Sequence, residues 1–365
     1  MKPKVLFIMH MPPPIHGASM VGKYIHDSKL VNEEFECFYL SPSTAKNINE
    51  IAKFSLLKVF RFIILLLKIG KILIFKKPDL VYYTATARKD GFRVSYIFVT
   101  WIRLFNNNIV VHFHNKGVCE NKKGIDGIIR KCFFRNIKVM LLSHNLFYDV
   151  EDWLDGKDVL ICPNGIPQTN EEIIERKNSV PHLLFLSNLL ISKGVYVLLD
   201  ACEILKDKGC SFVCDFVGAE SKEISESTFF AEVSKRGLGE FVKYHGRKYG
   251  AEKDSYFRNA DIFVFPTYNE TFGLVNLEAM QYQLPIVTTN EGGIPDVVKD
   301  GINGYVCERK NSESLAIAIE NLLLSPELRV KLGNQGYNIY MQNFTLDKFE
   351  RNFTDCIKQC LKSYG

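Results

Sequence analysis

The chain has 365 residues, of which 47% are hydrophobic, and a formal net charge of +5. This length exceeds that of one typical domain and predicts two, each able to bury a core. The ten cysteines are irregularly spaced and form no Cys-x-x-Cys pair, so we interpret them as buried thiols in a reducing compartment and not as a disulfide framework or a zinc site. Residues 1–165 hold 24 Lys and Arg against 14 Asp and Glu, an excess that predicts a partner bearing phosphates.

Apolar runs of strand length alternate with longer helical segments along the chain. The first run, Val5–Met9, is expected to be a strand and not part of a signal peptide, because prolines follow it at once. Most runs are continuously apolar, which is typical of parallel strands covered on both faces. The alternation predicts an α/β protein with two doubly wound Rossmann-like domains. The other expected strands are Phe35–Leu40, Leu80–Thr84, Ile109–His114, Val139–Ser143, Val159–Cys162, His182–Ser187, Phe212–Val217, Val242–His245, Ile262–Phe265, Ile286–Thr288 and Tyr305–Cys307.

We place the domain boundary after the turn-forming run Asn164-Gly165-Ile166-Pro167, where a polar linker begins. The expected domains are 1–167, which binds the acceptor, and 168–344, which binds the donor. Helices Ser312–Leu324 and Pro326–Asn343 close the second domain. For a final helix at about 345–365, the sequence leaves open whether it packs back on the first domain.

Residues 53–77 contain seven basic residues and no acidic one. Their longest uninterrupted apolar run, Phe62–Leu67, is far shorter than the roughly 20 residues that span a bilayer. A buried helix with a basic edge is one interpretation. The other is a helix lying on anionic lipid, where each nearby cation contributes about 1 kcal/mol. The number of cations favours the second, so we expect an anionic membrane surface as a partner. The apolar residues of Gly91–Phe105 are expected mainly to pack in the core.

The segment Gly17–Tyr24 nearly matches a P-loop, but Tyr24 stands where Ser or Thr must bind magnesium, which argues against an NTPase. We expect instead that His16 and Gly17 form a turn before a helix, where a residue without a Cβ lets the backbone approach a phosphate. The chain contains no Gly-x-Gly-x-x-Gly, which argues against a nicotinamide-dependent dehydrogenase.

Glu270 and Glu278 are two carboxylates around the start of an expected helix that follows the strand Ile262–Phe265. The N-terminus of a helix attracts phosphate, whereas carboxylates accept hydrogen bonds from hydroxyl groups. A sugar nucleotide is a ligand that carries both phosphate and hydroxyl groups. Taken alone, the pair could equally be a surface acid and an acid near the helix dipole. The motifs in the rest of the chain favour a site for a sugar nucleotide.

Motifs in both halves of the chain resemble, in residue type and order, those of family-4 retaining glycosyltransferases. The resemblance covers nearly the whole chain and is more specific in the C-terminal half. The motifs are Pro13-Pro14-Ile15-His16-Gly17, His112-Phe113-His114-Asn115, Pro163-Asn164-Gly165-Ile166, Leu186 to Gly194, Asp215-Phe216-Val217-Gly218, Tyr244-His245-Gly246, Glu270 to Glu278, Glu291 to Val298 and Gly301-Ile302-Asn303-Gly304.

The resemblance implies a GT-B fold, in which two doubly wound Rossmann-like domains face each other across a cleft. It implies that Glu270 holds hydroxyls of the donor sugar, that Lys193 neutralises the leaving diphosphate, and that His114 lies near the reacting sugar. The implied donor-binding residues also include Glu278 at the ribose diol, the backbone of Thr271, Phe272, Gly273 and Leu274, the turn at His16 and Gly17, and Asn188, Gly246 and Arg247.

Two positions depart from the family pattern. Asn188 stands where an arginine is usual, so Arg247 or another cation would have to compensate at the phosphates. The glycine-rich turn is Gly17-Ala18 instead of two glycines, so the backbone has less room at its second position. Both departures concern the details of phosphate binding.

The implied activity is metal-independent transfer of a sugar, with retention of configuration, from a nucleotide sugar (a UDP-sugar is favoured) to a lipid-linked saccharide. The implied setting is bacterial capsule, O-antigen or exopolysaccharide synthesis, with the enzyme in the cytoplasm and peripheral on the inner face of the membrane. No cofactor, metal or nucleic acid is expected. Two alternatives stay open: a sugar-nucleotide epimerase of similar fold, and a non-catalytic subunit that binds sugar nucleotides.

Overall fold

The computed structural model of the chain describes residues 1–13, 17–42, 56–120, 122–169 and 178–364. His16, the start of the basic segment 53–77 and most of the expected polar linker lie outside these residues. The chain divides into two compact units. The first contains Met1–Asn164 and Leu346–Gly365, and the second contains Gly165–Thr345.

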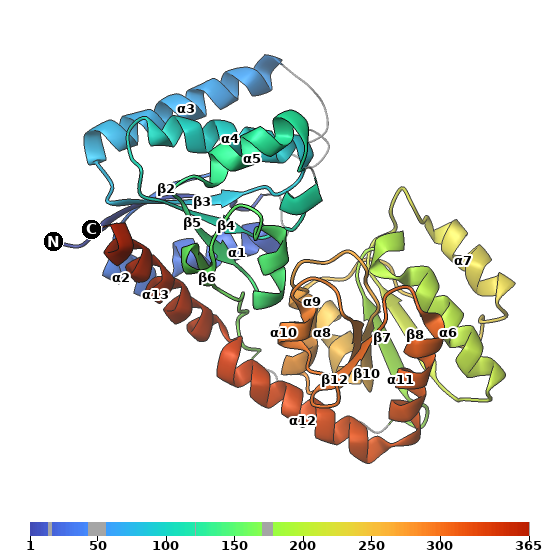
Figure 1. The fold of residues 1–365 in the computed structure, drawn as a ribbon. Helices are drawn as coiled ribbons and strands as arrows, with labels where there is room; N and C mark the ends of the chain where they lie inside the picture. Colours follow the sequence, from blue (N-terminus) through green and yellow to red (C-terminus); the bar gives the residue numbers. More distant parts are fainter. Residues whose placement is uncertain (14–16, 43–55, 121, 170–177, 365) are drawn as a thin grey trace. The chain divides into compact units, whose positions relative to one another are not determined.

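The first unit is built on a six-stranded parallel sheet with the order β2-β1-β3-β4-β5-β6. Helices α3, α4 and α5 cover one face, and α1, α2 and α13 cover the other (Figure 1). The strands are β1 (Lys4–Ile8), β2 (Glu36–Leu40), β3 (Leu80–Ala85), β4 (Ile109–Phe113), β5 (Lys138–Leu141) and β6 (Val159–Ile161). The helices are α1 (Gly17–Asp27), α2 (Lys29–Glu34), α3 (Leu56–Lys76), α4 (Lys89–Arg103), α5 (Gly124–Phe134) and α13 (Leu346–Tyr364).

The final helix, α13, packs on the first unit because one of its faces is apolar. Phe349, Phe353 and Ile357, spaced four residues apart, are buried in the same core as Phe7 of β1. At the end of the helix, the Tyr364 hydroxyl donates to the carbonyl of Ile109 at 2.8 Å. The last twenty residues therefore belong structurally to the unit in which the chain begins.

The second unit repeats the design with the strand order β12-β11-β10-β7-β8-β9, again parallel throughout. Its strands are β7 (His182–Leu186), β8 (Val213–Val217), β9 (Val242–Tyr244), β10 (Ile262–Phe265), β11 (Ile286–Thr289) and β12 (Gly304–Cys307). Its α-helices are α6 (Val195–Asp207), α7 (Glu226–Lys235), α8 (Gly250–Asn259), α9 (Leu274–Gln281), α10 (Ile294–Val297), α11 (Ser312–Leu324) and α12 (Pro326–Asn343).

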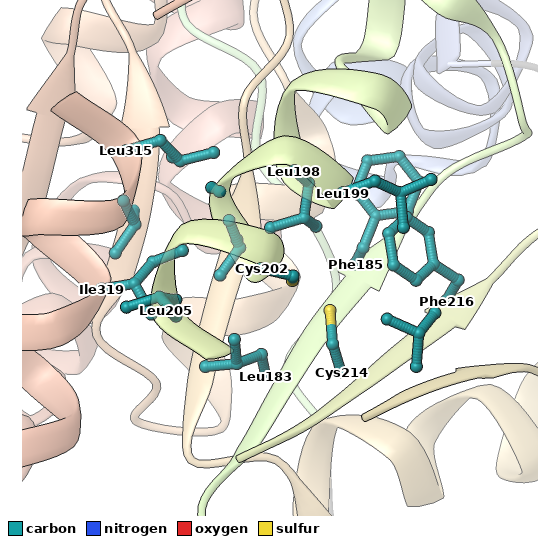
Figure 2. Packing of buried hydrophobic residues seen from close by; sticks show 14 of the residues in the cluster. Leu183, Phe185, Leu198, Leu199, Cys202, Leu205, Cys214, Phe216, Leu315 and Ile319 are labelled. Carbon is teal, nitrogen blue, oxygen red and sulfur yellow. The ribbon is translucent and has the colours of Figure 1, made fainter. Parts of the chain in front are cut away.

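Figure 2 shows how helix α6 fills the core of the second unit. Its apolar face packs on side chains of the two neighbouring strands β7 and β8, and α11 closes the side of this cluster. The labelled residues are Leu183, Phe185, Leu198, Leu199, Cys202, Leu205, Cys214, Phe216, Leu315 and Ile319. Continuous burial of this kind is the reason why the strands are apolar at successive positions.

All twelve expected strands are present, with ends that differ from the prediction by at most two residues. The predicted fold of two doubly wound parallel-sheet domains is confirmed. Helix α1 includes the whole of Gly17–Tyr24, so this stretch does not form the loop of a P-loop NTPase, and Gly17 begins the helix where the sequence predicted a turn before it. All ten cysteines are free; six are buried, whereas Cys132 is exposed, so burial does not apply to every thiol.

Candidate active site

Each sheet contains one point at which the strand order reverses, and ligands of open α/β sheets bind beyond the carboxyl ends of the strands at such points. In the second unit the reversal lies between β7 and β10, since the order continues from β7 to β8 and β9 on one side and from β10 to β11 and β12 on the other. The loops that follow β7 and β10 carry Lys193 and Glu270. The topology therefore brings together two residues that are 77 positions apart.

Lys193 and Glu270 form an ion pair, with 2.7 Å between Nζ and Oε2. The Lys193 ammonium also donates to the carbonyl of Asn269 at 3.2 Å and lies 5.6 Å from the ring centroid of Phe265. The other carboxylate oxygen of Glu270 accepts the backbone N–H of Thr271 at 2.8 Å. Both predicted catalytic residues of this unit are thus held in defined positions, with about a fifth of each side chain exposed.

The two loops are fastened to each other by backbone contacts. The Ser192 carbonyl accepts the N–H of Tyr268 at 3.0 Å and the hydroxyl of Thr267 at 3.2 Å. Gly194 adopts a left-handed conformation, with φ of 83°, and a Cβ at this position would lie 2.1 Å from the carbonyl oxygen of Pro266. Only glycine allows this approach, so Gly194 sets the spacing between Lys193 and the Glu270 loop.

The pKa of the Glu270 carboxyl results from opposing effects. Burial alone would raise it, but the charge and hydrogen bond of Lys193, together with the N–H groups of Thr271 and Phe272, lower it below its ordinary value. The group is therefore a carboxylate at neutral pH and a weak base. Such a carboxylate is suited to accept hydrogen bonds from hydroxyl groups.

Helix α9 begins directly after this loop. Gly273 caps it with φ of 77°; the N–H of Asn276 donates to the Gly273 carbonyl at 2.9 Å, whereas the first N–H groups of an α-helix have no acceptor within the helix. Phe272 is buried, and its N–H, like that of Thr271, is directed at the Glu270 carboxylate. The predicted donor-binding residues Thr271, Phe272, Gly273 and Leu274 therefore form one continuous strip of backbone at a helix N-terminus.

Glu278 lies one turn into α9 and is also paired with a lysine. Its Oε2 is 3.0 Å from Nζ of Lys253, which comes from α8. Both side chains are partly exposed. Each of the two predicted carboxylates thus has its own cation, one on a loop and one on a helix. No role was predicted for Lys253.

The three remaining predicted residues of this unit lie on loops at the same edge of the sheet. Asn188 follows β7, and its side-chain oxygen accepts the N–H of Ala219 at 3.2 Å, so it joins the loops after β7 and β8. Gly246 and Arg247 follow β9; the Gly246 carbonyl accepts the N–H of Gly218 at 2.9 Å, and the Arg247 guanidinium lies over the Tyr249 ring. Asn188 therefore has a structural contact of its own.

The predicted residues of the first unit lie at the carboxyl edge of its sheet. Gly17 is the first residue of α1, after β1 at the β1/β3 reversal, and His16 is outside the described residues. His114 follows β4 and is partly buried, with its ring 4.1 Å from that of His112. His112 is fully buried. Burial is the larger cause that lowers its pKa and the charge of the neighbouring His114 is the smaller one, so His112 stays neutral. The predicted roles of His16, Gly17 and His114 at the donor stay predictions.

Within the described residues, no three His, Cys, Asp or Glu side chains are grouped as metal ligands.

The structure also draws attention to Glu291, which the motifs include but to which no role was given. It is fully buried and accepts a hydrogen bond from Arg309. The only sequence signal for it is an acid directly before Gly292-Gly293.

Two Rossmann-like domains with parallel sheets are the architecture of GT-B glycosyltransferases. Anabaena HepE, solved in complex with UDP, has this fold over 98% of the present chain and 100% of its own, with a TM-score of 0.71 and 16% sequence identity. Residues 168–339, which make up most of the second unit, match the family model described as glycosyl transferases group 1.

Curated relatives match part of the chain. An uncharacterized glycosyltransferase of Methanocaldococcus jannaschii is 29% identical over 211 residues, which cover 58% of this chain and 56% of that protein. The capsular polysaccharide biosynthesis glycosyltransferase CapM of Staphylococcus aureus is 28% identical over 154 residues, covering 42% and 39%. The matched part of the chain thus spans about half the length of these relatives or less.

Proposed function

We propose that the chain is a retaining, metal-independent glycosyltransferase that moves a sugar from a UDP-sugar to a lipid-linked saccharide in the synthesis of a bacterial capsule, O-antigen or exopolysaccharide. The observation that carries the proposal is the pairing of Lys193 with Glu270 at the strand-order reversal, next to the N-terminus of α9. The UDP complex of HepE and the capsular role of CapM support the choice of donor and setting.

In the proposed reaction the donor diphosphate lies against the N–H groups of α9 and the Lys193 ammonium. These groups stabilise the negative charge that develops as the bond to the sugar breaks, and one such donor contributes about 10²–10³ in rate. Glu270 and Glu278 accept hydrogen bonds from hydroxyl groups of the sugar and of the ribose, respectively. The acceptor hydroxyl attacks the anomeric carbon from the face that the diphosphate leaves, and a departing phosphate oxygen takes its proton.

The environment of Glu270 favours transfer over epimerisation. An epimerase needs side chains that exchange protons near neutral pH, whereas Glu270 has a lowered pKa and both its oxygens are occupied. A carboxylate of this kind orients hydroxyl groups better than it moves protons. The two reactions also differ in their requirements, since only transfer needs an acceptor.

A thermal-shift screen tests the proposal directly. Ligands that bind the folded state raise its apparent stability, so UDP and one UDP-sugar are expected to raise the melting temperature more than GDP, ADP and their sugars. The UDP-sugar that binds should then release UDP only when a lipid-linked saccharide is added. Consumption of the donor without an acceptor would favour the epimerase, and binding of UDP without turnover over a panel of acceptors would favour the non-catalytic subunit.

Helix α3 supports the proposal that the chain also binds an anionic membrane surface. Leu65, Ile69 and Leu73 form its buried side, whereas the opposite side exposes an apolar row. The row consists of Phe60, Ile63, Leu67 and Ile74, with 61%, 49%, 61% and 49% of each residue exposed. Lys68 and Lys71 are exposed beside it, and α3 contains no acidic residue. Among the described residues, no helix is long and apolar enough to cross a membrane. An exposed apolar row flanked by cations complements the surface of an anionic bilayer.

We therefore expect the double variant Lys68→Glu/Lys71→Glu to bind vesicles containing phosphatidylglycerol more than about tenfold less tightly, because each cation near such a surface contributes about 1 kcal/mol. Leu67→Ser should weaken binding in the same direction. Vesicle flotation measures both. Lys243→Glu and Leu324→Ser, exposed positions in the second unit, serve as matched controls. Equal binding by variants and controls, or equal binding to pure phosphatidylcholine, would contradict the assignment.

A further inference from the structure

Glu291 is a completely buried carboxylate directly behind the Glu270 loop. It follows β11, and its exposed fraction is 0%. One of its oxygens accepts the backbone N–H of Glu270 at 3.4 Å, and the other accepts Nη1 of Arg309 at 2.8 Å. A buried carboxylate is costly unless it is paired and hydrogen-bonded, and the contact with Arg309 stabilises the charge at this position.

The segment that begins with Glu291 also holds the next peptide of the loop. The Gly293 N–H donates to the carbonyl of Thr271 at 2.7 Å. Gly292 has φ of 55°, and a Cβ there would lie 2.4 Å from the carbonyl oxygen of Glu270. The backbone on both sides of the Glu270 side chain is therefore held by residues 291–293, and only glycine at 292 permits the contact.

The turn after β12 contacts this arrangement at two places. Arg309, with 54% of its side chain exposed, reaches Glu291, while Nζ of the neighbouring Lys310 lies 4.7 Å from the ring centroid of Tyr268. The N–H of Asn290 donates to the carbonyl of Cys307 at 3.3 Å. Three successive segments at this edge of the sheet, 307–310, 290–293 and 268–271, are thus connected by hydrogen bonds, an ion pair and a cation–π contact.

We propose that Glu291 and Arg309 are a positioning pair that fixes the Glu270 loop, so that the Glu270 carboxylate faces Lys193 and a bound sugar. The inference rests on the proposed function for its effect on catalysis. Glu291 acts through the backbone of Glu270, and small displacements of a positioned group lower the rate of transfer strongly. In the proposed function the nucleotide binds Lys193 and the N–H groups of α9, none of which belongs to this pair, so binding of the nucleotide should depend on the pair little.

The test compares Arg309→Gln and Arg309→Lys with Arg236→Gln, which removes an arginine bound to Asp200 and Glu232 elsewhere in the same unit. In Arg309→Gln the peptide containing residues 266–275 should exchange its amide hydrogens about tenfold faster, since the N–H of Glu270 loses a fixed acceptor. The kcat for transfer should fall by about tenfold or more with a nearly unchanged Kd for UDP. In Arg309→Lys the change in amide exchange and the loss of kcat should both be smaller than in Arg309→Gln, because lysine keeps the positive charge.

The outcomes separate this inference from the proposed function. Unchanged exchange at 266–275 in Arg309→Gln would overturn the positioning role, and so would an equal loss of kcat in Arg236→Gln. If the wild-type protein turns over no nucleotide sugar, the proposed function fails, but the exchange measurement still decides whether Glu291 and Arg309 hold the loop. Thermal unfolding of each variant distinguishes local loosening from loss of the folded unit.

Discussion

Replacing Lys193 by methionine is expected to lower kcat for sugar transfer by about 10²–10³-fold, the usual effect of removing one preorganised group that stabilises developing negative charge. The loss should appear in kcat more than in KM, because the charge on the leaving diphosphate grows as the sugar bond breaks. Methionine preserves much of the side-chain volume over the Phe265 ring, so packing changes little. Steady-state release of UDP in the presence of acceptor measures the effect.

The variant also leaves Glu270 without its cation, and this must be separated from the effect on chemistry. Breaking one side of a largely buried pair destabilises the fold, whereas removing both charges restores much of the loss. The double variant Lys193→Met/Glu270→Gln should therefore unfold at a higher temperature than Lys193→Met while remaining as inactive. Lys208→Met, which removes the partner of Glu320 on the surface of the same unit, is the control for the loss of a lysine–glutamate pair. A kcat for Lys193→Met within about threefold of wild type would contradict the assignment.

The strands were predictable because their signal is local. Ile262–Phe265 is buried at every position. A run of four apolar residues followed by a proline is too short for a helix and favours a buried strand. The carboxyl ends of strands were less predictable. His114, Cys162, Ser187 and His245 each lie one residue beyond the assigned end of a strand. The N–H groups of Cys162, Ser187 and His245 still donate to carbonyls of the neighbouring strand, so the difference lies in where a strand is taken to end.

The contacts within the candidate site could not be predicted in the same way. Lys193 and Glu270 were each recognised from their own motif, but their ion pair depends on β7 and β10 being neighbours. Strand order is set by packing of the whole domain and leaves no local signal in a sequence. The same holds for Lys253 beside Glu278 and for Arg309 behind Glu291, where the partner comes from a different element.

Replacing Glu270 by glutamine is expected to separate binding of the donor from transfer. The Lys193 ammonium is paired with the Glu270 carboxylate at 2.7 Å, so a diphosphate that approaches Lys193 also meets this negative charge. Glutamine removes the charge and can still accept the N–H of Thr271, which preserves the shape of the loop. The affinity for UDP should rise about fivefold, or roughly 1 kcal/mol, the size expected for a partly exposed charge interaction.

Transfer should change in the opposite direction in the same variant. A sugar hydroxyl that loses a charged acceptor loses about 1.5–3 kcal/mol of interaction. The sugar is then no longer held in the orientation that transfer needs, so kcat should fall by about 10²-fold. Isothermal titration with UDP and release of UDP in the presence of acceptor measure the two effects. Glu320→Gln, which frees Lys208 instead, should change neither. Weaker binding of UDP by Glu270→Gln would mean that the diphosphate does not compete with this carboxylate for Lys193, and the donor would have to be placed elsewhere in the domain.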